Sequence, residues 1–382
     1  FPNLETQIVS KDLSDLFVMM SSQKPETLKL TGETDLFASV KTQNKVISVS
    51  EIQGHFLGTS LKGNIDVDTK EKVPNVKVNL DLGDLDLVRI LPDSFGHSGP
   101  MTHKHNQPST ANDPDQKRNV RWSRNAINTE FLQFFNGNLE FAANSIKLKR
   151  TTLDKTALKA SLTNGHLDIK AFETNAFDGK MRLSGLVKTD KDPRSPLSFN
   201  TDIEFIEVSS GQLLTSLRGV PSRFVSGTIN HSGKYSSFGL SPAAIIFGLE
   251  GQGTLTGSDI TITGMDLDRL AKNLATANSG SDALELLNSS LAGGETFFNN
   301  LKGEYSITEG IVNVRPLTLA GENTNVTATG TIDLPLWDID LETVLEIAEP
   351  ADAPPVKASF KGSLDDPKRT SAPNPLSSSI NN

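Results

Sequence analysis

The sequence predicts a mainly β protein with a long curved antiparallel sheet, shaped as a groove or open half-barrel and carrying a few short helices. The first reason is that apolar and polar residues alternate along many segments, as in 61–68 and 76–82, which is typical of strands with one solvated face. The second is a five-residue pattern, apolar-x-Gly-x-apolar, that recurs along the chain. The third is the presence of hairpin turns such as Asn164-Gly165.

The recurring pattern places a glycine where a side chain of the apolar face is expected. Positions i, i+2 and i+4 of a strand point to one side, so each glycine shares a face with its apolar neighbours. A glycine in a strand marks a bend or a close approach by another group. Two interpretations stay open: the glycines allow the sheet to coil, or they leave room for an elongated apolar ligand. The copies are centred on Gly63, Gly137, Gly185, Gly227, Gly303, Gly330 and Gly362.

Composition excludes several classes of function. The 382 residues contain no cysteine, so disulfides and thiolate sites are not available. The formal net charge of −9, with acidic residues spread along the chain, argues against nucleic acid as a partner. The longest apolar stretches, 16–20 and 243–249, are shorter than the ~20 residues that span a membrane. The chain opens on Phe1-Pro2, so we expect any targeting or anchoring element to lie upstream.

The pattern along the chain divides it into six segments. Helical spacing over 8–22 predicts an N-terminal helix, and a second change of period after residue 265 predicts two short helices broken at 278–280. A short helical piece is expected at 129–135. The predicted segments are 1–91 (N-terminal helix and first β module), 92–121 (flexible insertion or linker), 122–265 (second β module), 266–291 (helical segment), 292–366 (C-terminal β module) and 367–382 (disordered tail).

Two hairpins can be aligned residue by residue. A two-residue Asn-Gly loop favours a type I′ turn, because both positions need positive φ. The loop at 164–165 then sets the register of its two strands, and Glu309-Gly310 does the same further along. The expected pairs are Leu162 with Leu167, Ala160 with Ile169, Leu158 with Ala171, Ser161 with Asp168, Ile307 with Val312 and Tyr305 with Val314.

No residue pattern supports catalysis or metal binding. His97, His103 and His105 are close in sequence, but they fall in the predicted insertion, with no acidic partner nearby to fix a ligand geometry. The acidic clusters 81–86 and 338–342 have largely period-two spacing, which puts them on the solvated face of strands. Nucleophile-elbow, phosphate-loop, zinc-protease and dinucleotide motifs are all missing from the sequence. We therefore expect a non-enzymatic protein with no catalytic residue, no metal and no cofactor.

Several stretches, taken in their order along the chain, resemble the C-terminal region of the AsmA family of bacterial envelope proteins. They are Leu162-Thr-Asn-Gly-His-Leu-Asp-Ile169, the strand-Gly segment 177–185, the hairpin 301–312 and the closing Phe360-Lys-Gly-Ser-Leu-Asp-Asp-Pro367. The resemblance implies a periplasmic protein, anchored in the inner membrane by an N-terminal helix that this sequence does not contain. It also implies a link to outer-membrane biogenesis and to phospholipid transport between the two membranes. The architecture of the family is similar to that of chorein-type bridge proteins, whose curved sheets hold acyl chains.

Two functions are carried forward as expectations. In the first, phospholipid acyl chains lie in a hydrophobic β groove, and the partners are phospholipid, the membrane and other envelope proteins. In the alternative, the protein is a structural or assembly factor for outer-membrane proteins, with its apolar face closed by its own helices. The residues expected to line the lipid groove are Leu61, Ile65, Val67, Val76, Val78, Leu80, Leu82, Leu158, Leu162, Leu167, Ile169, Met181, Leu183, Val187, Ile203, Phe205, Ile307, Val312, Val326, Ile332, Leu334, Ile339 and Leu341.

Overall fold

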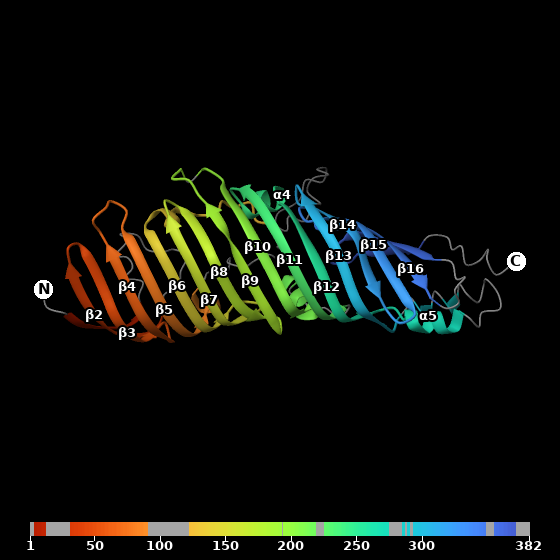
Figure 1. Ribbon diagram of the computed structural model, residues 1–382, viewed down its shortest axis with the longest axis horizontal. Helices are drawn as coiled ribbons and strands as arrows, with labels where there is room; N and C mark the ends of the chain where they lie inside the picture. The colour runs from red at the N-terminus through yellow and green to blue at the C-terminus, as the bar shows by residue number, and fades with distance from the viewer. Residues whose placement is uncertain are drawn as a thin grey trace, which may run out of the picture. The chain divides into compact units, whose positions relative to one another are not determined.

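The computed structural model describes residues 4–12, 31–90, 122–192, 194–218, 225–274, 285–286, 289–290, 293–348 and 355–371. Eighteen strands of these residues belong to one sheet, in which each strand neighbours the next along the chain (Figure 1). The helices are short. The predicted fold class is confirmed: the protein is mainly β, with a curved, unclosed sheet.

The strands are β1 (Leu4–Asp12), β2 (Thr31–Gln43), β3 (Val46–Phe56), β4 (Thr59–Asp68), β5 (Asn75–Asp86), β6 (Asn136–Lys147), β7 (Thr152–Thr163), β8 (His166–Ala176), β9 (Gly179–Lys188), β10 (Leu197–Ser209), β11 (Val225–Gly239), β12 (Glu250–Thr263), β13 (Glu295–Thr308), β14 (Ile311–Ala320), β15 (Thr324–Asp333), β16 (Asp338–Ile347), β17 (Val356–Ser363) and β18 (Lys368–Ser371). The helices are α2 (Leu87–Ile90), the 3-10 helix η2 (Glu130–Gln133), α3 (Ser210–Arg218), α4 (Pro242–Phe247) and α5 (Leu267–Leu274).

One pair of strands departs from the expected antiparallel order. β5 and β6 run parallel, with Asn75 opposite Asn136 and Asp86 opposite Lys147. A parallel neighbour requires the chain to return to the start of the previous strand, which a short hairpin cannot do. The long connection between β5 and β6 allows this return, and the backbone N–H of Asn136 donates to the carbonyl of Pro74 at 2.9 Å. The predicted insertion, 92–121, lies outside the described residues.

The prediction of an N-terminal helix over 8–22 is wrong for its first residues, 8–12. Residues 4–12 form β1, which pairs antiparallel with β2, with Ile8 opposite Leu36. The apolar spacing that suggested a helix depends mainly on residues 13–22, which lie outside the described part of the chain. Over residues 4–12 the pairing with β2 provides backbone hydrogen bonds to alternate residues, so the tertiary context overrides a weak local pattern.

Both predicted hairpins are confirmed except for one pair. Asn164 and Gly165 have φ of 50° and 79°, and Leu162 lies opposite Leu167. Further from the turn, Leu158 lies opposite Phe172 and not Ala171, because the register shifts by one residue between Lys159 and Ala160. A bulge of this kind bends the strand and increases its twist. In the second hairpin Ile307 pairs with Val312 and Tyr305 with Val314, as expected.

Helices and the tail show mixed outcomes. η2 and α5 confirm the expected pieces at 129–135 and after 265, while most of the second helix expected there lies outside the described residues. Neither α3 nor α4 was expected from the sequence, although α4 carries a readable start signal. Ser241 caps it by accepting from the N–H of Ala244 at 3.2 Å, and Pro242 follows at the first turn. The tail is not disordered throughout, because residues 368–371 form β18 along β17.

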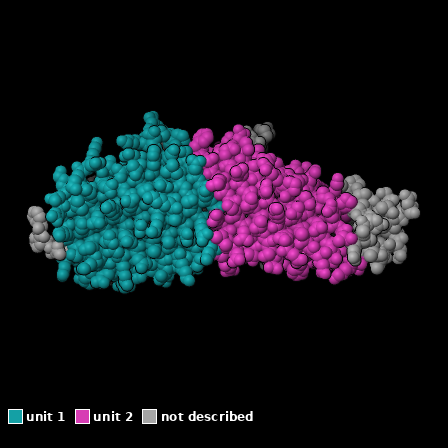
Figure 2. All heavy atoms as spheres, in the orientation of Figure 1, with its two compact units in different colours: residues 1–97, 126–176, 180–203 teal, residues 98–125, 177–179, 204–382 magenta. Residues whose placement is uncertain are grey.

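The chain forms two compact units (Figure 2). Unit 1 comprises residues 1–97, 126–176 and 180–203, and unit 2 comprises 98–125, 177–179 and 204–382. A small buried cluster of unit 1 consists of Ile52, Leu61, Leu82, Ala143 and Ile146. The core of unit 2 is larger and includes residues from α5. The division into three β modules stays a prediction.

The glycines of the recurring pattern are explained mainly by the backbone. Gly63 has φ of 147°, and a Cβ built there would lie 2.1 Å from the carbonyl oxygen of Asn79 on the neighbouring strand. Gly330 repeats this geometry, with φ of 140° and a Cβ position 2.1 Å from the carbonyl oxygen of Asp340. Only glycine tolerates both the backbone conformation and the close approach. These two positions support the first interpretation, in which glycine allows the sheet to coil.

We predict that Gly63→Ala lowers the free energy of unfolding of unit 1 by about 3 kcal/mol, from backbone strain and overpacking of about 1–3 kcal/mol each. Gly58→Ala is the matched control, since Gly58 has φ of 82° but no atom within 4 Å of an added Cβ. It retains the strain without the collision and should cost about 1 kcal/mol. Hydrogen exchange of 59–68 and 75–86 under increasing urea measures both variants. Equal effects would contradict the close-approach explanation.

Candidate functional site

Unit 1 contains an apolar groove of about 540 Å³ on the inner face of β1 to β5. Thr6 is the only polar residue among the described residues that line it. The other lining residues are Ile8, Leu36, Ala38, Val49, Ile52, Phe56, Leu57, Leu61, Ile65, Leu80, Leu82, Leu85 and Leu87. A groove of this size falls in the range of about 300–1,000 Å³ that is typical of small-ligand sites.

The strand registers bring these side chains to one face. Leu61 lies opposite Leu82, and Gly63 lies opposite Leu80. The intervening residues, such as Lys62 opposite Asp81, are exposed on the other face. Because side chains alternate along a strand, a short sequence of alternating residues yields one continuous apolar face and one charged face.

Within the part of the chain that the structure describes, the groove has a buried base and an open mouth. Ile52, Leu61 and Leu82 are 7%, 8% and 9% exposed and form the base. Ile8 on β1 is 41% exposed, and Leu80 and most of the other lining residues are half-buried. Contiguous apolar surface that remains in contact with water is unfavourable, and it commonly marks a binding site. The geometry therefore suits an elongated apolar ligand that is accessible from solvent.

The structure places only some of the predicted groove residues in the lining of the groove. Leu61, Ile65, Leu80 and Leu82 line the groove of unit 1. The others are half-buried or buried on β4 and β5, on later strands of unit 1 or in unit 2, and Leu162 is only 1% exposed, which leaves it little surface for a ligand. On β4 and β5, the half-buried residues that continue the apolar alternation are Val67, Val76 and Val78. On later strands of unit 1, the half-buried predicted residues are Leu158, Leu167, Ile169, Met181, Leu183, Val187 and Ile203. In unit 2, Ile307 is buried, and the half-buried predicted residues are Phe205, Val312, Val326, Ile332, Leu334, Ile339 and Leu341.

Sequence reasoning missed the contributions of β1, β2 and β3 to the groove. Registers shift between Phe37 and Ser39 and between Val49 and Ile52, so the alternation in these strands is broken by bulges. A bulge moves the following residues to the other face, which hides the pattern. The run Leu36-x-Ala38 was the signal that could have located β2 beside the groove.

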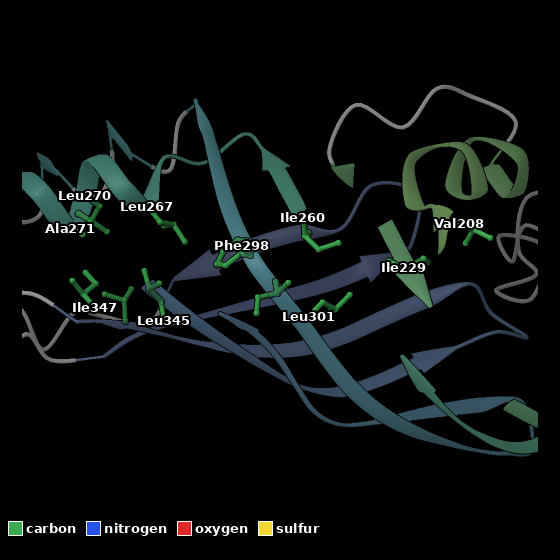
Figure 3. Packing of buried hydrophobic residues seen from close by; sticks show 12 residues of the cluster. Val208, Ile229, Ile260, Leu267, Leu270, Ala271, Phe298, Leu301, Leu345 and Ile347 are labelled. Atoms are coloured by element: carbon green, nitrogen blue, oxygen red, sulfur yellow. The ribbon is translucent and has the colours of Figure 1, made fainter. Parts of the chain in front are cut away.

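The corresponding face of unit 2 is filled at one end. Leu267, Leu270 and Ala271 of α5 are 2%, 0% and 4% exposed and belong to the same buried cluster as Phe298 and Leu345 (Figure 3). Thr296, itself fully buried, accepts from the N–H of Leu267 at 3.0 Å and so ties the start of α5 to β13. In this region the protein's own helix occupies the space that a ligand would need.

A polar cluster interrupts the apolar face of unit 2. Nε2 of His231 lies 2.8 Å from the hydroxyl of Tyr235, whose oxygen also contacts the hydroxyl of Tyr305. Nδ1 of His231 lies 3.0 Å from the carbonyl oxygen of Thr254. Burial lowers the pKa of His231 below its ordinary value, and burial raises the pKa of both tyrosines. The cluster is therefore uncharged at neutral pH.

Other features of the described residues carry no functional site. Those residues contain no group of three or more histidine, aspartate or glutamate side chains placed to hold a metal ion. His97, His103 and His105 lie outside them. Among the helices of the described segments, none is long and apolar enough to cross a membrane.

A comparison with sequence models of known families shows which family the chain belongs to. The sequence model of the AsmA family matches residues 13–317, which is more than half of the protein and includes the strands of the groove from β2 onward. The chain belongs to the AsmA family. Membership suggests a role related to the cell envelope or to lipid transport. No curated protein and no solved structure matches this AsmA-family chain.

Proposed function

We propose that this AsmA-family protein is a non-enzymatic, periplasmic component of the cell envelope that holds phospholipid acyl chains in the groove of unit 1. The observation that carries the proposal is the apolar groove of about 540 Å³ that the described residues leave open on the inner face of β1 to β5. Anchoring in the inner membrane, by a helix outside this sequence, and a role in moving lipid towards the outer membrane follow from family resemblance and belong to the same proposal.

The physical basis of binding is the removal of apolar surface from water. Each CH₂ group that enters the groove contributes about 0.8 kcal/mol. Lining residues such as Leu36 and Leu80 offer only dispersion and hydrophobic contacts, so the groove favours acyl chains over polar molecules. Head groups would remain in solvent, because no charged residue is among the described residues of the lining. This arrangement predicts weak preference among phospholipid head groups.

A second candidate function is an assembly factor for outer-membrane proteins, and one observation favours it. In unit 2 one end of the apolar face is filled by α5, as expected for a sheet that is closed there by its own helix. Extended segments could then add to the exposed edges of the sheet. The two candidates differ in whether lipid or polypeptide contacts unit 1.

Photo-crosslinking from two adjacent positions on β2 tests the proposal. Leu36 lines the groove, whereas its neighbour Phe37 does not and is 45% exposed. A photo-reactive residue at position 36 should crosslink phospholipid in cells, and the same residue at position 37 should not. Native mass spectrometry of the purified protein should show bound phospholipid. Crosslinks from position 36 to polypeptide alone would overturn the proposal and favour the assembly function.

A further inference from the structure

The His231–Tyr235–Tyr305 cluster lies on the same face as apolar residues of unit 2. Gly253 pairs with Tyr305 on one side and with Gly233 on the other, and Leu255 pairs with His231. The ring of Phe205 lies 5.7 Å from the ring of His231. All three rings of the cluster are only partly buried. Solvent or a ligand on this face can therefore reach a polar group in apolar surroundings.

The hydrogen bonds of the cluster have a direction. Nδ1 of His231 lies beside a carbonyl oxygen, which can only accept, so this nitrogen carries the proton and donates to Thr254. Nε2 then accepts from the nearer hydroxyl, that of Tyr235 at 2.8 Å rather than that of Tyr305 at 3.4 Å. With its proton used there, the oxygen of Tyr235 accepts from the hydroxyl of Tyr305. In this series of hydrogen bonds, the N–H of His231 and the two tyrosine O–H groups all donate within the cluster. The oxygen of Tyr305 keeps its lone pairs to accept a hydrogen bond from a ligand.

Three glycines make room for the two tyrosine rings. A Cβ at Gly253 would lie 2.5 Å from the hydroxyl oxygen of Tyr305, and one at Gly233 would lie 2.4 Å from that of Tyr235. A Cβ at Gly251 would meet the ring of Tyr235 at 2.7 Å. The rings therefore lie over these glycines. At these positions glycine does leave space, but the space is occupied by side chains that present polar atoms.

The site is unsuited to a charged group. The nearest charged residues on these strands, Lys234, Lys302 and Glu304, are exposed and alternate onto the opposite face. A phosphate at the cluster would lose water without gaining a cation, which is costly. An uncharged hydroxyl loses less and can donate to Tyr305.

We propose that His231, Tyr235 and Tyr305 bind the hydroxyl group of an uncharged lipid, a diacylglycerol or a lipid of the same chemistry, in unit 2. The acyl chains would lie along half-buried residues such as Phe205, Leu255 and Val314. This site goes beyond the proposed function, because it assigns a different ligand chemistry to the other unit.

Tyrosine-selective NMR tests the site directly, since both tyrosines of the chain belong to it. Protein with ¹³C-labelled tyrosine rings is titrated with 1,2-dioctanoylglycerol, and separately with the same molecule acetylated on its hydroxyl. Both ring signals should shift with dioctanoylglycerol. The acetylated molecule should bind roughly 3- to 10-fold more weakly, the effect of one hydrogen bond between neutral groups.

The Tyr305→Phe variant should bind dioctanoylglycerol as weakly as wild type binds the acetylated molecule. Unmoved ring signals, equal affinity for the two molecules, or unchanged affinity in Tyr305→Phe would each overturn the site. Crosslinking of phospholipid from position 36 reports on unit 1 and is expected to be the same in Tyr305→Phe. If phospholipid did not crosslink from position 36 but the tyrosine ring signals still shifted with dioctanoylglycerol, the proposed function of the groove would be wrong and the site in unit 2 would still be supported.

Discussion

Phe298→Ala is expected to lower the free energy of unfolding of unit 2 by about 3–5 kcal/mol, the usual cost of removing a buried phenylalanine. Phe298 is 1% exposed and packs in the cluster that contains α5. Its removal leaves a cavity between the sheet and the helix, so α5 loses part of the surface that holds it. Chemical denaturation followed by tryptophan fluorescence measures the effect, because both tryptophans of the chain, Trp122 and Trp337, belong to unit 2.

The neighbouring residue provides the control. Phe297 lies on the same strand but on the opposite face, where it is 58% exposed. Phe297→Ala makes the same chemical change with little lost burial and should alter the free energy of unfolding by less than about 0.5 kcal/mol. Similar effects in the two variants would show that α5 does not cover this part of the sheet.

The hairpins could be predicted because the information lies within a few residues. Asn164-Gly165 sets both the turn type and the first pairs of the register, and the structure agrees up to Ala160. The error at Leu158 arises from a bulge, which depends on how the strand twists against its neighbours rather than on local composition. The parallel pairing of β5 with β6 has the same origin, since it depends on the course of a long connection.

The candidate site was predictable only where alternation is unbroken. Leu61, Ile65, Leu80 and Leu82 come from β4 and β5, which pair without a shift and read as regular alternating strands. The other wall of the groove contains β1, whose nine residues are too few to outweigh the helical spacing that follows. Whether an apolar face is open or filled depends on where α5 packs, and sequence periodicity does not contain that information.

The His231–Tyr235–Tyr305 cluster could not be predicted either, because it also depends on which elements pack together. His231 and Tyr305 are far apart in sequence, and each alone reads as an ordinary strand residue. They meet because β12 lies between their strands and contributes Gly253, whose lack of a side chain lets the rings approach. The sequence contained the signal Gly251-x-Gly253, but its meaning depends on which strands lie on either side.

A charge placed in the groove is expected to abolish lipid binding. In Leu80→Glu the carboxylate lies among apolar lining residues, where an acyl chain beside it would strip its water. The free protein tolerates the change because Leu80 is half-buried and the groove is open to solvent. We expect the amount of co-purified phospholipid, measured by native mass spectrometry, to fall at least ~10-fold, which corresponds to about 1.4 kcal/mol.

Two variants separate this effect from general damage to the strand. Asn79→Glu adds the same charge one residue away on the exposed face, and it should leave bound phospholipid unchanged. Leu80→Ala removes apolar contact without adding charge, so it should reduce binding only a few-fold. Circular dichroism confirms that each variant is folded. If Leu80→Glu retained lipid as Asn79→Glu does, acyl chains would not lie on this face of β5, and the groove of unit 1 would need another occupant.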